Sequence, residues 1–269
     1  MSEQETDPQS GETGETPPLL GIEGVTKTFG GVTALSDVGF AVTEGRVQGL
    51  IGPNGAGKTT LFNVITGAYP PDSGTVRLNG APMQGKPLRQ VVRSGVARTF
   101  QNVELFESLT ALENVMVGGH ARTKSGFWGA VLRPPATRRE EIHLRDRGHE
   151  LLDFVGLPEA ADRPAGDLPF GWQRLLEIAR ALAADPRLLL LDEPAAGLNA
   201  VETERLGELI GRIRDRGVTV MLVEHDMSLT MRVCDRIAVL DQGRLLAEGA
   251  PREVQADPAV TAAYLGGGE

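Results

Sequence analysis

The chain contains little cysteine, few aromatic residues and no long apolar run. Its one cysteine, Cys234, cannot close a disulfide within the chain, which fits a reducing cytosol and favours an ordinary core position for the thiol. The longest unbroken aliphatic run, 188–191, is far shorter than the ~20 residues that a membrane-spanning helix requires. No basic segment followed by an apolar one opens the sequence. We therefore expect the chain neither to be secreted nor to span a membrane.

Basic residues are absent from residues 1–18, which carry five acidic ones. This polar segment ends in two prolines and predicts a disordered acidic tail. Over all 269 residues the net charge is −9 and 41% of the residues are hydrophobic, so the remainder predicts a mildly acidic globular chain of one or two domains. That charge argues against nucleic acid as the main partner.

The patterning changes twice along the chain. From residue 20 to 85, short β-like runs alternate with turn signals and are interrupted by a helical stretch from Lys58 to about Thr66. A helical pattern follows, including a helix over 139–155. Two apolar runs, 188–191 and 218–223, predict central strands buried on both faces. A hairpin is predicted over 236–247, and terminal helices are predicted to begin at Pro251 and Pro258. We therefore predict an α/β chain with parallel central strands, an antiparallel portion and a helical insertion.

A glycine-rich loop joins an apolar strand, 47–51, to the first of these helices. Its sequence matches G-x-x-x-x-G-K-[ST], in the strand–loop–helix context that a phosphate-binding loop requires. Backbone N–H groups would turn inward around phosphates, Lys58 would reach the outer ones, and the Thr59 hydroxyl could bind Mg²⁺. A purely structural glycine turn is the alternative, which this context disfavours. The candidate binding residues are Gly52, Pro53, Asn54, Gly55, Ala56, Gly57, Lys58, Thr59 and Thr60.

Polar residues that suit phosphate chemistry follow the two predicted central strands. Asp192 is placed to hold Mg²⁺ through water, and Glu193 beside it can polarise an attacking water. Taken alone, this acidic pair would be interpreted as facing solvent, but the phosphate-binding loop favours the chemical role. His225 follows the second strand, and Gln101 lies where the β-rich part gives way to the helical part. Taken singly, these two would be a packed or surface histidine and a surface glutamine.

The stretch LPFGWQRLLEIARAL, residues 168–182, predicts a helix over 174–182, because apolar residues recur there at three- and four-residue steps. Trp172 and a bare glycine stand where this helix begins. A helix N-terminus offers unpaired N–H groups and the positive end of a dipole, which suit an anion. The alternative is an entry loop in which Trp172 packs against the core.

Taken in order, the phosphate loop, the Gln101 loop, LPFGWQ, LLLLDEP, AAGLN and the His225 loop resemble the ATP-binding subunit of ABC transporters, from about residue 20 to 267. The resemblance implies a P-loop NTPase (RecA-like) core with an antiparallel β subdomain and an inserted helical subdomain. It implies an ABC ATPase domain over 19–267. Within it, the core and β subdomain take 19–100 and 181–250, the helical subdomain with the signature helix takes 101–180, and a C-terminal helical segment takes 251–267.

The same resemblance implies roles for single residues. The nucleotide would be ATP, with Phe29 stacking on adenine and His225 contacting the γ-phosphate. Glu193 and His225 would be the catalytic pair. Gln101 would touch Mg²⁺ and report the nucleotide state to membrane subunits, so the implied metal-binding residues are Thr59, Gln101 and Asp192. Asn199 stands where the family usually has an aspartate.

LPFGWQ occupies the family's LSGGQ signature, whose helix N-terminus caps the γ-phosphate of ATP bound to the other subunit. The residues implied in this contact are Pro169, Phe170, Gly171, Trp172 and Gln173. Pro169 replaces the serine and has neither hydroxyl nor N–H, so donors are lost there. The helix dipole and the N–H of Gly171 remain, and Trp172 keeps one donor.

These departures, with the ending AAYLG, resemble one branch of the family: the ATPases of branched-chain amino acid importers. The branch implies uptake of branched-chain amino acids or related small polar solutes at the cytoplasmic face of the membrane. The implied partners are a second, probably different ATPase subunit, two membrane permeases and, indirectly, an extracellular solute-binding protein. A non-transport ABC ATPase in DNA repair or on ribosomes is the main alternative, disfavoured by the short insertion and acidic charge. A P-loop GTPase or small-molecule kinase is a third, but no N-K-x-D motif exists.

Overall fold

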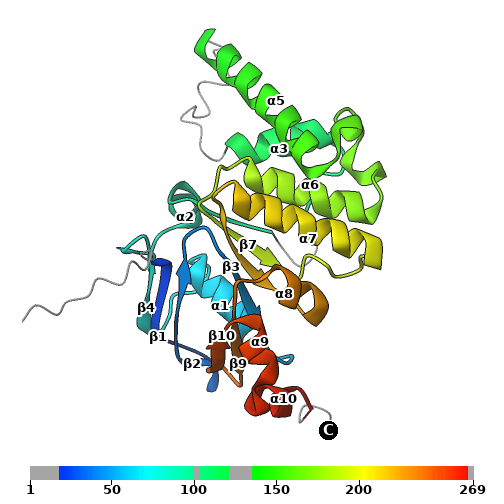
Figure 1. Cartoon of the computed structure of the whole chain (residues 1–269). Helices are drawn as coiled ribbons and strands as arrows, with labels where there is room; N and C mark the ends of the chain where they lie inside the picture. Colours follow the sequence, from blue (N-terminus) through cyan, green and yellow to red (C-terminus); the bar gives the residue numbers. More distant parts are fainter. Residues whose placement is uncertain (1–17, 100–102, 121–134, 266–269) are drawn as a thin grey trace, which may run out of the picture.

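The computed structural model describes residues 18–99, 103–120 and 135–265, which form two sheets and a helical arm (Figure 1). The first sheet is antiparallel, in the order β2-β1-β4-β5. Its strands are β1 (Pro18–Phe29), β2 (Val32–Thr43), β4 (Ser73–Leu78) and β5 (Ala81–Pro82). Residues 1–17 of the predicted acidic tail lie outside the described residues. Its last residue, Pro18, belongs to β1, because it pairs with Thr43 and the buried Leu19 and Leu20 continue that strand.

The second sheet has six strands in the order β10-β9-β3-β8-β7-β6. All neighbours are parallel except β9 and β10, which form the predicted hairpin. The strands are β3 (Val47–Ile51), β6 (Val96–Arg98), β7 (Leu188–Asp192), β8 (Thr219–Val223), β9 (Arg236–Asp241) and β10 (Arg244–Gly249). Every residue of β3, β7 and β8 is buried, which explains their unbroken apolar sequences.

Alternate residues of β7 enter two different hydrophobic cores, because successive side chains of a strand point to opposite faces. Leu188 and Leu190 pack in the core shared with α1 (Lys58–Ile65) and the antiparallel sheet. Leu189 and Leu191 pack in the core shared with the helical arm and the remaining large helices. Those helices are α7 (Ala200–Asp215) and α8 (Met227–Val233). The edge of the sheet and the chain end carry α2 (Leu88–Arg93), α9 (Pro251–Ala256) and α10 (Pro258–Leu265).

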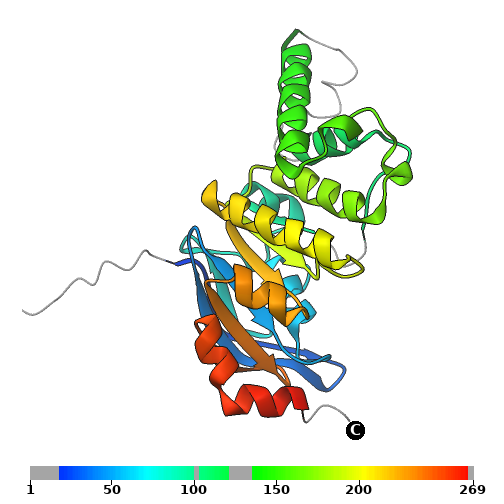
Figure 2. The ribbon, with the colours of Figure 1, turned by 45° about the vertical axis from the view of Figure 1, so that its right-hand side comes forward.

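The helical arm projects beyond the end of the six-stranded sheet, as both ribbon views show (Figure 2). It comprises α3 (Ala111–His120), α5 (Pro135–Val155) and α6 (Phe170–Leu182), with short turns η1 (Pro158–Ala160) and η2 (Ala165–Asp167). Helix α3 packs against both α5 and α6. Gly148 of α5 permits the close approach of α3, since a Cβ there would lie 2.6 Å from the side chain of Leu112 in α3.

Two helices of the arm begin earlier than the sequence predicts. Helix α5 starts at Pro135 instead of residue 139. Helix α6 starts at Phe170 instead of 174, because Pro169 supplies a fixed backbone turn and its carbonyl accepts hydrogen bonds from Trp172 (2.9 Å) and Gln173 (3.0 Å). The predicted strand at 218–223 starts one residue later, at Thr219.

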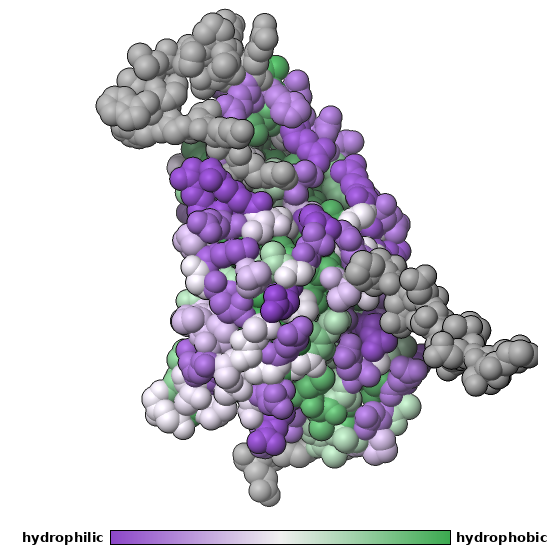
Figure 3. All heavy atoms as spheres, turned by 90° about the vertical axis from the view of Figure 1, so that its left-hand side faces the viewer, coloured by the Kyte–Doolittle hydropathy of each residue, from purple (hydrophilic) through white to green (hydrophobic). Residues whose placement is uncertain are grey.

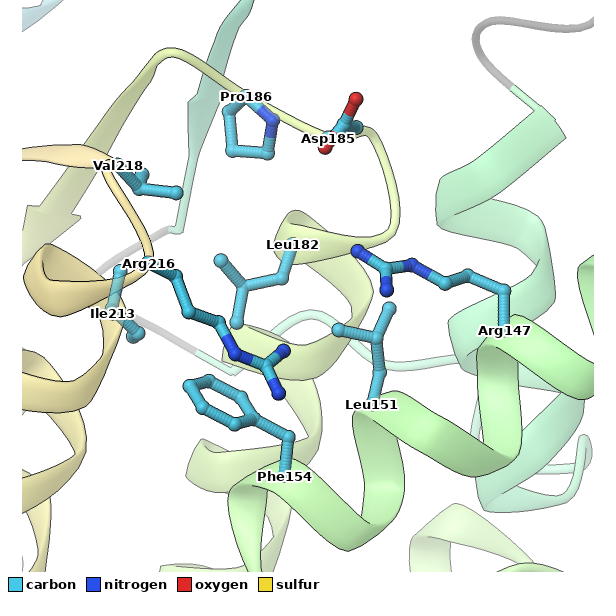
Figure 4. A pocket seen from close by; sticks show the side chains of 9 residues that line it. All are labelled: Arg147, Leu151, Phe154, Leu182, Asp185, Pro186, Ile213, Arg216 and Val218. Carbon is cyan, nitrogen blue, oxygen red and sulfur yellow. The ribbon is translucent and has the colours of Figure 1, made fainter.

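A cavity of about 290 Å³ lies where the arm meets the core, between α5 and the ends of α6 and α7 (Figure 4). Arg216, after α7, stacks on Phe154 of α5, with its guanidinium carbon 3.6 Å from the ring centre. Arg212 also donates a hydrogen bond to the Phe154 carbonyl. The arm is therefore held to the core partly by cation–π contacts between Phe154 and the two arginines.

The surface view shows hydrophilic residues over the upper part of one face, where the arm lies, and apolar ones gathered lower down, over the β-rich part (Figure 3). No helix among the described residues has the length and apolar character to cross a membrane. Cys234 is buried beside β3, and burial raises the pKa of its thiol to about 12. The predicted core position of this cysteine is confirmed.

Candidate functional site

The glycine-rich loop follows β3 and turns directly into α1. Gly57 precedes the helix with φ 101° and lies so close to strand β2 that a Cβ would be 2.6 Å from the Ala34 carbonyl oxygen. Only glycine fits this conformation and this contact. The first N–H groups of α1 have no intrahelical partner and point out of the helix N-terminus, whose dipole favours an anion.

Lys58 is the first residue of α1 and only 6% exposed. Its ammonium donates to the carbonyl oxygens of Gly52 (2.7 Å) and Pro53 (3.0 Å). Burial lowers the pKa of Lys58, and the nearby carboxylates of Glu193 and Asp192 oppose that shift. An ammonium has three donors, so Lys58 can hold the loop and still bind an anionic oxygen.

Strands β7 and β8 are parallel neighbours, so the residues after them meet at one edge of the sheet. Asp192 ends β7, and its carboxylate accepts a hydrogen bond from Arg98 Nη2 at 2.7 Å. Glu193 follows in a left-handed conformation, φ 48°, which is strained for a residue with a side chain. Its Oε1 lies 2.9 Å from Nε2 of His225, which follows β8. The tight turn therefore aims Glu193 across to the histidine.

These groups surround one open cavity of about 240 Å³. Most of the predicted binding residues line it, together with both predicted catalytic residues: Asn54, Gly55, Ala56, Gly57, Lys58, Thr59, Thr60, Glu193 and His225. Gly52 and Pro53 lie behind, bonded to Lys58.

Phe29 lies at the tip of the β1–β2 hairpin and is 41% exposed. Its ring meets Tyr69 edge-on at 5.2 Å between centres, and the Lys27 ammonium lies 5.3 Å from its centre. An exposed ring in such a cluster can stack on a flat base. Gln101 lies outside the described residues.

The signature segment starts α6, and its residues do not line this cavity. Phe170 packs directly on Gly197, where a Cβ would lie 2.9 Å from the ring. The Glu202 carboxylate lies against Gly171. Trp172 is half-buried against the core, with the Arg163 guanidinium 5.7 Å from its ring centre.

Gln173 turns back to its own loop. Its amide donates to the carbonyls of Leu168 (3.1 Å) and Ala165 (3.3 Å). Asn199 caps α7 by accepting from the backbone of Val201 and Glu202, both at 3.0 Å. An aspartate is thus not needed there to begin the helix.

Four residues near the site were missed by the sequence analysis: Ala34, Tyr69, Arg98 and Glu224. Ala34 lies near the start of β2 and Tyr69 in the loop after α1, and neither stands in a distinctive sequence pattern. Arg98 stands close before Gln101, but its contact with Asp192 is long-range. Glu224 did carry a signal, since it is a carboxylate between an apolar strand and the predicted His225.

Comparison with known proteins agrees with this geometry. A family model described as ABC transporter matches residues 35–196, more than half of the chain. The chain belongs to the ABC transporter family. A second model, described as branched-chain amino acid ATP-binding cassette transporter, matches residues 244–269.

Several relatives match this ABC subunit over nearly its whole length. The high-affinity branched-chain amino acid transport ATP-binding protein BraF of Pseudomonas aeruginosa is 47% identical, covering 93% of this chain and 98% of its own. LivG of Escherichia coli, named for the same transport, is 45% identical with the same coverage. A solved ATP-binding cassette of an ABC transporter, in its ADP conformation, superposes with a TM-score of 0.82 at 31% identity, covering 93% of this chain and all of that one.

The predicted family, fold class and enzyme class are therefore confirmed. The chain is a nucleotide-binding ABC ATPase with a P-loop core, an antiparallel β sheet and a helical insertion, and it hydrolyses ATP to drive transport. The alternatives of a non-transport ABC ATPase, a GTPase or a small-molecule kinase are set aside by the same matches.

Proposed function

We propose that this ABC ATPase powers the uptake of branched-chain amino acids or related small polar solutes through separate membrane subunits, at the cytoplasmic face of the membrane. The names of the relatives and the match of the chain's end to the branched-chain amino acid model support this. We further propose the domain division predicted above, with 19–100 and 181–250 as the core and β subdomain, 101–180 as the helical subdomain and 251–267 as the C-terminal segment.

One observation carries the catalytic proposal: the Glu193–His225 contact at 2.9 Å, on the wall of the cavity that holds Lys58. In this proposal Lys58 and the loop N–H groups bind the phosphates of ATP, Glu193 polarises water and His225 contacts the γ-phosphate. Phe29 stacks on adenine.

Mg²⁺ would be held by Thr59 and by Asp192 through water, with Gln101 completing the set. No group of three or more His, Cys, Asp or Glu among the described residues could hold a metal. This fits Mg²⁺, which takes one or two protein ligands and completes its shell with phosphate and water oxygens. The ion would neutralise charge on the phosphates.

A second cavity, of about 300 Å³, supports the proposal of membrane-subunit partners. It lies between the arm and β6 and is lined by apolar and charged residues, including the exposed Phe106 and Val117. Arg98 lines it too and also bonds Asp192, so a membrane subunit docked here would touch a residue in contact with the ATP site.

We also propose that the ATPase partner is a different chain, and that Pro169, Phe170, Gly171, Trp172 and Gln173 face its nucleotide. A solved ATP-binding cassette with ADP and Pi, superposing at a TM-score of 0.73 and 27% identity, is described as dimeric. The Glu202 carboxylate against Gly171 adds negative charge beside this helix start, which would weaken the contact of this helix with the phosphate of the partner's nucleotide.

Two substitutions test the catalytic roles in the transporter assembled from this chain and its partners. Glu193→Gln should bind ATP normally and lose nearly all turnover, whereas Lys58→Ala should weaken binding itself. A folded Glu193→Gln protein with most of its turnover would remove Glu193 from the mechanism. Unchanged ATP affinity in folded Lys58→Ala would contradict the site.

The solute class is tested by uptake into vesicles containing the assembled transporter. We expect ATP-driven uptake of leucine, isoleucine or valine, abolished by Lys58→Ala. Uptake of urea or a short amide instead would move the assignment to a related solute. Failure of the chain to co-purify with any membrane subunit would overturn the importer role.

A further inference from the structure

Glu224 is a buried carboxylate between two functional loops. It follows β8 directly and is only 3% exposed. Its Oε1 accepts a hydrogen bond from the N–H of Ala195 at 2.7 Å. Its Oε2 accepts from the N–H groups of His225 at 2.9 Å and Asp226 at 3.2 Å. One side chain thus bonds the loop after β7 and the loop after β8.

Burying a carboxylate is unfavourable, and burial raises the pKa of Glu224 while the three backbone N–H groups oppose the shift. A buried carboxylate at position 224 is not needed to begin helix α8. Asp226 already caps that helix, accepting from Ser228 (2.9 Å) and Leu229 (3.0 Å). An apolar residue at 224 would continue the strand without a buried charge, so the carboxylate has another role.

Its two bonds act on the backbone that carries the Glu193–His225 pair. Ala195 follows Glu193 after one proline, and His225 is the next residue after Glu224. A backbone hydrogen bond also joins the Glu193 N–H to the carbonyl of Val223, the last residue of β8, at 2.9 Å. Together the two bonds fix both ends of the short turn in which Glu193 holds its left-handed conformation.

We propose that Glu224 is a positioning residue, which holds Glu193 and His225 in register by bonding the backbones of both loops. It is not among the residues that line the cavity proposed to bind the nucleotide. The loop beyond Ala195 also contains Gly197, on which Phe170 of the signature helix packs. Glu224 therefore also anchors the start of the segment that reaches the signature helix. The proposal rests on the catalytic roles proposed above for Glu193 and His225.

The decisive variant is Glu224→Gln in the full chain, assembled with its partners. Its amide nitrogen cannot accept a hydrogen bond, so one of the two loops loses its bond. Because small displacements of reacting groups reduce turnover strongly, we expect kcat for ATP to fall by about 10- to 100-fold. The KM should change by less than about threefold, since the bonds of Lys58 and the phosphate loop are untouched. If Glu224→Gln does not fold, Glu224→Asp, which is too short to span both loops, replaces it.

Glu253→Gln is the matched control. Glu253 also accepts a backbone N–H, that of Ala250 at 2.8 Å, but it lies at the start of α9. Hydrogen exchange gives a readout independent of catalysis: Glu224→Gln should speed exchange at Ala195 or at His225 and Asp226, and the control should not.

The kcat values and the exchange rates together distinguish the positioning role from a purely structural one. Faster exchange in these loops with a fall in kcat alone supports the positioning role. Unchanged kcat, or equal losses of kcat in Glu224→Gln and Glu253→Gln, overturns it. If Glu193→Gln and His225→Ala both retain turnover while Glu224→Gln alters exchange, the catalytic roles of the pair fail and the bonds of Glu224 stand as structural only.

Discussion

Arg98 places a positive charge against Asp192 in a nearly buried ion pair, with side-chain exposures of 11% and 4%. It also bonds Asn63 at 2.6 Å and lies over the ring of Phe62. The carboxylate proposed to hold Mg²⁺ is thereby kept in one orientation by a residue that the sequence did not single out.

Arg98→Met should lower the free energy of unfolding by about 3 kcal/mol, because it leaves a buried carboxylate without its cation. Urea unfolding measures this. Arg187→Met is the control: its pair with Glu44 is exposed, 45% and 40%, and its loss should cost below about 1 kcal/mol. Equal losses in the free energy of unfolding would show that the buried Arg98–Asp192 pair stabilises the fold no more than an exposed pair does.

Phe29→Ala should weaken ATP binding by about 0.5–1.5 kcal/mol, the amount typical of lost aromatic stacking. Titration with a fluorescent nucleotide measures it, and GTP should lose a similar amount, because stacking discriminates poorly between bases. Unaltered affinity would mean that Phe29 serves only its cluster with Tyr69 and that another residue holds the base.

Among the elements, β7 and β8 could be predicted almost to the residue, since a strand buried on both faces must be apolar throughout. The start of α6 could not. Gly171 and Trp172 are poor helix formers, and what begins the helix is Pro169 with its two accepted hydrogen bonds. The backbone geometry and hydrogen bonds of Pro169 outweighed the low helix propensity of Gly171 there.

The phosphate loop was predicted because its chemistry is local: loop, lysine and helix are contiguous in the chain. The contacts of Arg98 and Glu224 were not predicted, because each joins segments brought together only by the order of the parallel strands. The spacing of residues along the sequence does not reveal which strands lie side by side in the sheet.

At the N-terminus of α6, Pro169→Ser with Trp172→Gln should raise turnover at the partner's site if missing donors limit it. Each restored hydrogen bond to a charged phosphate is worth about 1.5–3 kcal/mol. Single-turnover kinetics of the assembled transporter, with Lys58→Ala silencing this chain's own site, would isolate the effect. An inert or uncoupled double mutant would instead identify the half-buried indole as a packing wedge.

For the whole molecule, the altered signature predicts two unequal ATP sites. The site on Lys58 would be completed by the partner's signature, and the partner's site by the poorer one of this chain. Lys58→Ala should therefore stop ATP-driven transport, whereas the matching lysine substitution in the partner should leave a measurable remainder. Vesicle uptake compares the two, and equal losses, or a larger loss from the partner's substitution, would refute the asymmetry.

The burial of Cys234 makes the natural chain a ready background for site-directed spectroscopy. Thiol reagents attack the thiolate, and a pKa of about 12 keeps this thiol protonated at neutral pH. No native cysteine has to be removed before labels are attached elsewhere. Cysteines placed at Val32, 70% exposed on the antiparallel sheet, and Ile142, 54% exposed on the arm, would take a spin-label pair. The distance between those labels would record how far the arm swings against the core in each nucleotide state.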